Sequence, residues 1–188
     1  MSDIAILKQM IKENITVSLV EQKEGTHLNY SVTLIETQDN YSVTIDGMPK
    51  PDDVIVINAE EFAAPRTVFQ GAKDECKRAD FIIIADTPVE KIIICIEMKK
   101  TKGKKIIQQL KGAKCFVAYC QEIGKAFWNQ HNFLETYQYR FVSIGHIPVS
   151  KTSTRHQGKQ TDSNKTHDCP ERMLRISGKN YIQFDYLI

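Results

Sequence analysis

The sequence predicts one α/β domain, with a mixed β-sheet flanked by helices and an antiparallel β-meander near the N-terminus. Two isoleucine-rich runs, residues 79–86 and 91–98, are apolar on both faces, as strands of a covered sheet are. Residues 104–123 repeat apolar side chains at helical spacing. Three earlier segments alternate strictly between apolar and polar side chains, as strands with one solvated face do: residues 15–19, 30–34 and 41–45.

The remaining elements follow from local signals. Residues 2–14 predict a helix, because Ile4, Leu7 and Ile11 fall on one face at helical spacing. Ser2 is its expected N-cap. Residues 54–57 are apolar on both faces and predict a covered strand. In the helix of residues 104–123, Gly112 either lowers helix stability by about 1 kcal/mol or marks a close approach. The predicted buried stripe of this helix is Ile106, Leu110, Ala113, Val117 and Cys120.

Residues 140–144 predict a further strand. Four parts of a single domain 1–188 are therefore expected. They are a helix and meander (1–58), a core (60–149), a flexible polar loop (150–171) and terminal strands (172–188).

Composition excludes several classes of protein. The chain has 188 residues and an ordinary globular balance, with 41% hydrophobic and 26% charged residues. No apolar run approaches the roughly 20 residues of a membrane span, and no signal-peptide pattern opens the chain, so we expect a cytoplasmic protein without membrane partners. Five cysteines without a C-x-x-C pair argue against a disulfide framework or a zinc site. No Walker loop, serine-nucleophile elbow or cofactor motif is present.

Charge is unevenly distributed along the chain. Residues 1–62 hold four Lys and eleven Asp or Glu, a net charge of −7. Residues 63–125 hold thirteen basic and seven acidic residues, a net charge of +6. This asymmetry indicates either an anion-binding surface or a solvated lysine-rich face.

The two isoleucine-rich runs bring specific chemistry together. If residues 87–90 form a four-residue turn, cross-strand partners have numbers that sum to 177, and Asp80 lies opposite Glu97. Two carboxylates on directly opposed residues of neighbouring strands repel each other unless a cation lies between them. Lys99 projects from the same face as Glu97. The pattern therefore predicts either a metal site or a salt bridge of Lys99 with a carboxylate.

A metal site here suits hydrolysis of phosphodiesters. Asp80, Glu97 and the backbone carbonyl of Met98 offer hard oxygen ligands for Mg²⁺, for which Mn²⁺ can substitute. In this interpretation Lys99 positions the attacking water or stabilises charge on the phosphorus.

The same residues carry a resemblance to a known family. The segment Lys77-Arg-Ala-Asp80, a short turn, Glu97-Met-Lys99 and a helix with Gln108-Gln109-Leu110 resemble the PD-(D/E)xK, or restriction-endonuclease-like, nuclease superfamily. The resemblance covers residues 71–119. It implies that Asp80 and Glu97 bind metal, that Lys99 is catalytic and that Gln109 lies near the active site. It also implies a further upstream acidic ligand, for which the candidates are Glu13, Glu60 and Glu61.

The expected function is that of a Mg²⁺-dependent nuclease, a DNA endonuclease of defence or DNA processing, with DNA favoured over RNA. The alternative is a catalytically inactive protein of the same fold that binds nucleic acid or a protein. Dimers are common in such nucleases, and the acidic meander can form a dimer or partner surface or only cap the core. The candidate phosphate-binding residues are Lys100, Lys102, Lys104, Lys105, Lys111 and Lys114.

Overall fold

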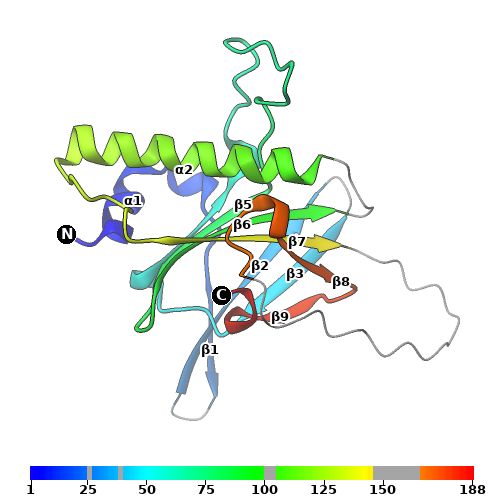
Figure 1. Ribbon diagram of the computed structural model, residues 1–188. Coiled ribbons are helices and arrows are strands. Elements are labelled where there is room, and N and C mark those ends of the chain that lie inside the picture. Colours follow the sequence, from blue (N-terminus) through cyan, green and yellow to red (C-terminus); the bar gives the residue numbers. More distant parts are fainter. Residues whose placement is uncertain (25–26, 38–39, 100–104, 146–165) are drawn as a thin grey trace, which may run out of the picture.

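A computed structural model describes residues 1–24, 27–37, 40–99, 105–145 and 166–188. It is a mixed α/β fold in which two β-sheets pack beside two helices (Figure 1). The helices are α1 (Asp3–Met10) and α2 (Ile106–Trp128). The strands are β1 (Val20–Glu24), β2 (His27–Glu36), β3 (Tyr41–Asp46), β4 (Val54–Asn58), β5 (Phe81–Asp86), β6 (Lys91–Lys99), β7 (Gln138–Gly145), β8 (Leu174–Ser177) and β9 (Tyr181–Gln183).

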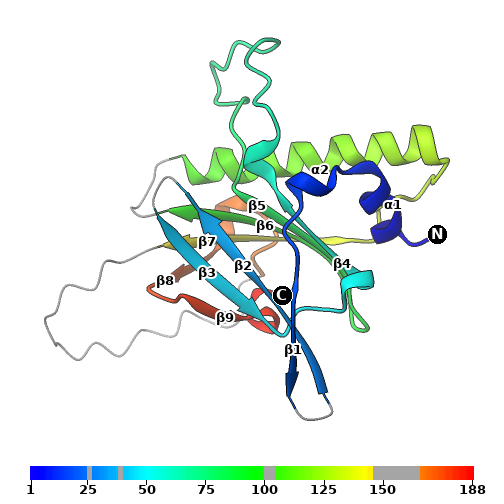
Figure 2. The same ribbon diagram turned by 180° about the vertical axis from the view of Figure 1, so that it is seen from behind.

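The central layer is a mixed sheet of strand order β4-β5-β6-β7-β8. Strands β4, β5 and β6 run antiparallel, whereas β6, β7 and β8 run parallel. Both helices cover one face of this sheet, and the second sheet, of order β1-β2-β3-β9, covers the other (Figures 1 and 2). The expectation of a sheet flanked by helices therefore holds on one face only.

The meander covers the central sheet through its apolar face. The alternation predicted for residues 30–34 and 41–45 is confirmed, because Val32, Leu34, Val43 and Ile45 are fully buried against the central strands. Strand β9, from the far end of the chain, pairs parallel with β3 and completes this sheet. The inner face of the meander thus caps the core.

The prediction of a strand over residues 15–19 is wrong. Glu13–Ile15 form a 3-10 turn, and the Thr16 hydroxyl and amide both donate to the carbonyl of Glu13, the first residue of that turn. Thr16 then makes only an isolated bridge to Ile57 while the chain crosses from the central sheet to the meander. Strand β1 therefore begins at Val20.

Strand β9 ends five residues before the end of the range 172–188 in which terminal strands are predicted. Pairing ends at Gln183, and Phe184–Leu187 form a 3-10 turn instead. Phe184 and Leu187 are both buried; residues three apart share a face in a 3-10 turn, whereas an extended strand would place them on opposite faces. Most of the polar loop predicted over 150–171 lies outside the described residues, as does Lys104 at the predicted helix start.

Helix α2 extends five residues beyond its predicted end. All five residues of the predicted stripe are buried, and Phe116 and Gly124 join them. The helix ends at Asn129, whose left-handed backbone (φ 55°) lets its N–H donate to the Gly124 carbonyl. At the other end of the chain, the Ser2 hydroxyl caps α1 by accepting from the Ala5 N–H at 3.2 Å, as predicted.

The predicted register of the β5–β6 hairpin is confirmed. Pairs run from Phe81 with Ile96 to Asp86 with Lys91, and each sums to 177. The turn closes where the Thr87 N–H donates to the Glu90 carbonyl at 3.0 Å. This register places Asp80, one residue before β5, beside the end of β6.

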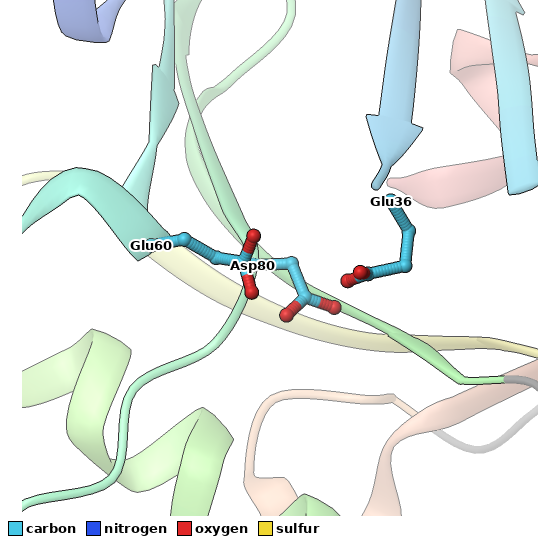
Figure 3. A group of neighbouring side chains, drawn as sticks. All are labelled: Glu36, Glu60 and Asp80. Carbon is cyan, nitrogen blue, oxygen red and sulfur yellow. The ribbon is translucent and has the colours of Figure 1, made fainter. Parts of the chain in front are cut away.

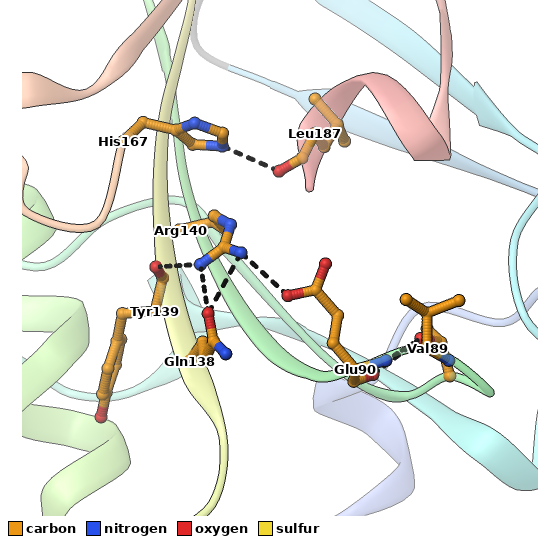
Figure 4. Close-up of polar contacts among 8 residues, drawn as sticks. Val89, Glu90, Gln138, Tyr139, Arg140, His167 and Leu187 are labelled. Atoms are coloured by element: carbon orange, nitrogen blue, oxygen red, sulfur yellow. Dashed lines mark hydrogen bonds and ion pairs between the residues drawn. The ribbon is translucent and has the colours of Figure 1, made fainter. Parts of the chain in front are cut away.

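Polar contacts tie the hairpin turn to β7 at the opposite end of the sheet from Asp80. Arg140 on β7 forms an ion pair with Glu90 at 2.8 Å and donates to Gln138 at 3.3 Å (Figure 4). Close by, a ring nitrogen of His167 lies 2.9 Å from the Leu187 carbonyl oxygen. These contacts hold the far end of the hairpin and the C-terminal turn in place.

Gly112 marks a close approach rather than a weak point of the helix. A Cβ atom at this position would lie 1.8 Å from the Lys77 carbonyl oxygen and 2.7 Å from its carbon. Helix α2 therefore packs directly on the backbone of the segment that leads to Asp80, and only glycine allows this contact.

We expect Gly112→Ala to lower the free energy of unfolding by about 1–3 kcal/mol, because overpacking outweighs the gain in helix propensity. Urea unfolding followed by circular dichroism measures the change. Gly145→Ala is the control, since a Cβ there meets its nearest atoms at 3.5 Å or more. A Gly112→Ala protein more stable than the wild type would contradict the close approach.

Candidate active site

Three carboxylates from distant parts of the chain meet at one end of the central sheet. Glu36 is the last residue of β2, Glu60 lies in the 3-10 turn Ala59–Glu61 after β4, and Asp80 directly precedes β5. One carboxylate oxygen from each lies within 4.8 Å of the others (Figure 3). The site therefore joins the meander to strands β4 and β5 of the central sheet.

The backbone around Asp80 explains this convergence. Its N–H donates to the Ile96 carbonyl at 3.2 Å, and its carbonyl accepts from the Ala59 N–H at 2.8 Å. Its side chain Oδ2 accepts from the Met98 N–H. Asp80 is thus fixed between β6 and the turn that carries Glu60, so strand pairing alone brings Asp80 and Glu60 together.

Glu97 lies beside this group and is completely buried. Its Oε1 is 2.8 Å from Nζ of Lys99, which is half-buried on the same face of β6. Its Oε2 is also buried and has no hydrogen-bond partner among the described residues. A buried carboxylate oxygen without a partner is costly, so this position favours a proton or a cation.

The electrostatics of the site follow from burial and crowding. Burial and the neighbouring charge of Glu97 raise the pKa of Asp80, although the Met98 N–H partly opposes this shift. Burial likewise raises the pKa of Glu97, against the opposing effect of Lys99. Burial and then Glu36 raise the pKa of Glu60. Burial acts to lower the pKa of Lys99, but Glu97, Asp80 and Glu36 raise it overall.

The carboxylates open into a cleft of about 330 Å³. Lys99 and Gln109 line it, and so do cations from the segment of residues 62–78, which we name the arm. The arm extends from the body of the protein past α2 (Figures 1 and 2). The full lining is Glu36, Glu60, Arg66, Cys76, Lys77, Arg78, Asp80, Lys99 and Gln109.

The predicted site residues divide into those that meet here and those that do not. Asp80, Lys99 and Gln109 line the cleft, and Glu97 is buried next to Lys99. Met98 contributes its N–H to Asp80, and no contact among the described residues places its carbonyl in the carboxylate group. Of the three upstream candidates, Glu60 joins the group, whereas Glu61 and Glu13 are exposed outside the cleft.

Sequence reasoning missed Glu36. The signal was present, because Glu36 continues the inward-facing series of Val32 and Leu34 at the end of an alternating strand. An acidic residue at an inward position is buried in the folded protein, and a buried carboxylate usually has a functional partner.

The candidate phosphate-binding lysines that the structure describes have intramolecular partners. Lys105 pairs with Asp74 at 3.2 Å, and Lys111 pairs with Glu171 at 2.7 Å. The Lys114 ammonium lies 5.2 Å from the centre of the Tyr139 ring. The other three predicted lysines, Lys100, Lys102 and Lys104, lie outside the described residues.

Comparison with known proteins gives no relative for this chain. No family model matches it, and neither the curated proteins nor the solved structures contain a significant match. Neither helix in the described part of the chain is long and apolar enough to cross a membrane.

The buried carboxylates predict an unusual dependence of stability on pH. Because their folded-state pKa values are raised, Asp80 and Glu97 bind protons more tightly in the folded protein than in the unfolded chain. Their contribution to stability is fully present below the unfolded pKa of about 4 and is lost as pH rises through the folded pKa.

We therefore expect the melting temperature in EDTA to fall by roughly 3–8 °C between pH 5.5 and pH 8.5. Asp80→Asn should reduce this fall, because the amide keeps an acceptor for the Met98 N–H but carries no charge. Differential scanning fluorimetry measures both proteins. An identical pH dependence in the two would show that the buried carboxylates do not control stability.

Proposed function

We propose that the chain is a Mg²⁺-dependent nuclease with a restriction-endonuclease-like core that hydrolyses phosphodiester bonds of nucleic acid. The observation that carries this proposal is the meeting of Glu36, Glu60 and Asp80 within 4.8 Å in a cleft that Lys99 also lines. Burying several like charges together destabilises a fold, so such a group favours a bound cation.

The donor set fits Mg²⁺. Carboxylate oxygens are the hard ligands that this ion prefers, and Glu36, Glu60 and Asp80 each offer one to a common point. The unpartnered Oε2 of Glu97 adds a further buried acceptor beside them. When bound, Mg²⁺ supplies a Lewis acid for the phosphate and a water molecule of lowered pKa; Mn²⁺ can replace it.

The protein side chains supply orientation and charge. Lys99 is held by Glu97 at 2.8 Å, and its ammonium lines the cleft, where it stabilises negative charge that develops on the phosphate oxygens. Gln109, on the first turn of α2, offers an amide that can orient the attacking water. Asp80 and Glu60 are positioned by backbone hydrogen bonds, so their geometry does not depend on flexible loops.

The order of elements supports the same proposal. The Asp80 strand, the Glu97-x-Lys99 strand and α2, which carries Gln109, follow one another in the chain. This is the order that the resemblance to the PD-(D/E)xK superfamily implies. From that resemblance we also propose DNA as the substrate, and a role in defence or DNA processing.

Glu60 and Glu61 provide a matched pair for testing the site. We expect Glu60→Gln to lower Mg²⁺-dependent cleavage by roughly 100-fold or more, because it removes one ligand charge from the group. Glu61→Gln should leave cleavage within about twofold, because Glu61 is exposed outside the cleft.

Cleavage is measured on supercoiled plasmid, linear duplex, single-stranded DNA and RNA with Mg²⁺, Mn²⁺ or EDTA. Glu36→Gln, tested alongside, should behave as Glu60→Gln does. Equal activity of the Glu60 and Glu61 variants would refute this site, and no cleavage of any substrate by folded wild-type protein would refute the nuclease assignment.

Lys99→Ala separates an enzyme from a protein that only binds. We expect turnover to fall by about 10²–10³-fold while the dissociation constant for DNA changes by less than about threefold, since Lys99 acts on developing charge. A gel-based cleavage assay and fluorescence anisotropy measure the two quantities on the same preparation. Unchanged turnover in a folded Lys99→Ala protein would be incompatible with a catalytic lysine.

A further inference from the structure

We propose that the arm, rather than the lysine-rich face of α2, binds the substrate backbone. Arg66, Lys77 and Arg78 contact the phosphates that neighbour the one at the carboxylates. This inference rests on the proposed function for the identity of the ligand as nucleic acid, and it adds which surface of the protein holds that ligand.

The first observation is that the arm cations line the cleft without a side-chain ion pair among the described residues, while the charge of Arg78 acts on Glu60 and opposes the rise of its pKa. Arg66, Lys77 and Arg78 all line the carboxylate cleft. Within the described ranges, none of them forms an ion pair, and the buried Nε of Arg78 has no acceptor. Phosphate oxygens suit guanidinium groups because they accept paired N–H donors.

The second observation is that residues 71–78, the later part of the arm, are firmly held. The Glu75 carboxylate accepts from the Gly71 and Lys73 N–H groups, each at 2.8 Å, and so closes the end of the arm into a compact turn. Lys105 at the start of α2 pairs with Asp74 at 3.2 Å. The Lys77 carbonyl lies so close to Gly112 that α2 fixes this part of the arm.

The lysines at the start of α2 and along it, unlike the arm cations, already have intramolecular partners. Lys105 helps to hold the arm, and Lys111 and Lys114 are engaged with Glu171 and the Tyr139 ring. Binding a phosphate through Lys111 or Lys114 would therefore first require the loss of an existing contact, whereas Arg66 and Lys77 have no ion pair among the described residues to lose.

The third observation is that the cleft continues along the arm. A second cavity of about 280 Å³ shares Arg66, Cys76 and Lys77 with the carboxylate cleft and reaches Phe69. A small phosphate ester would occupy the first cavity alone. A nucleic-acid strand, which repeats its phosphates along the chain, places successive charges along both.

The test measures binding without cleavage. Fluorescence anisotropy in EDTA, at 50 to 200 mM KCl, follows labelled 20-nucleotide single-stranded DNA, duplex DNA and RNA. Two double variants remove the same charge: Arg66→Ala with Lys77→Ala in the arm, and Lys111→Ala with Lys114→Ala on α2. Melting temperatures of both are compared with the wild type.

We expect the arm variant to bind the preferred substrate at least about 10-fold more weakly. The slope of log affinity against log salt concentration should become shallower by nearly two, because two fewer phosphates are neutralised and fewer ions are released. The α2 variant should stay within about twofold of the wild type. Arg66→Glu, a single exposed change, should weaken binding further than Arg66→Ala.

Wild-type binding by the arm variant, or an equal loss in the α2 variant, would overturn the inference, as would absence of binding by the wild type. Because the assay contains no metal, these outcomes are separate from those of the cleavage assays. Binding through the arm without any cleavage would support this inference while rejecting the nuclease assignment.

Discussion

The site depends on the backbone clamp around Asp80. Its N–H, carbonyl and carboxylate bond in turn to Ile96, Ala59 and Met98, so one residue joins β6 to the turn after β4. The two backbone hydrogen bonds, to Ile96 and from Ala59, extend the strand pairing of the central sheet. Glu60 and Lys99 take their positions from this clamp, because they lie on the elements that it joins.

Gathering carboxylates in a buried place lowers stability unless their charge is compensated. Lys99 offsets part of this charge through its ion pair with Glu97, yet burial still raises the pKa of both Asp80 and Glu97. A fold keeps buried carboxylates, although they lower its stability, when the site that they form has a function, and this supports the proposed metal site. The apolar strands around it, with Ile83, Ile94 and Ile96 fully buried, supply the compensating hydrophobic stabilisation.

The second sheet has a role beyond covering the core. Its inner face buries apolar side chains against the central strands, and the same inward series ends in Glu36. The meander therefore supplies one of the three carboxylates that meet at the site. The arm, which also lines the cleft, packs closely on α2 at Gly112, so its position relative to the site is set by helix packing.

The sequence by itself determined the elements and register of the hairpin, because local periodicity and a four-residue turn allow only one pairing of residues 81–86 with 91–96. It also determined the buried stripe of α2 and the capped start of α1. The prediction of a strand over 15–19 was wrong, because the same alternation of apolar and polar side chains also occurs in a 3-10 turn followed by a crossing segment. Only the tertiary structure decided that Glu60 rather than Glu13 or Glu61 joins Asp80, and that Glu36 completes the group. These three residues are 20 or more positions apart along the chain, so local propensity does not bring them together and only the packing of the sheets determines their contact.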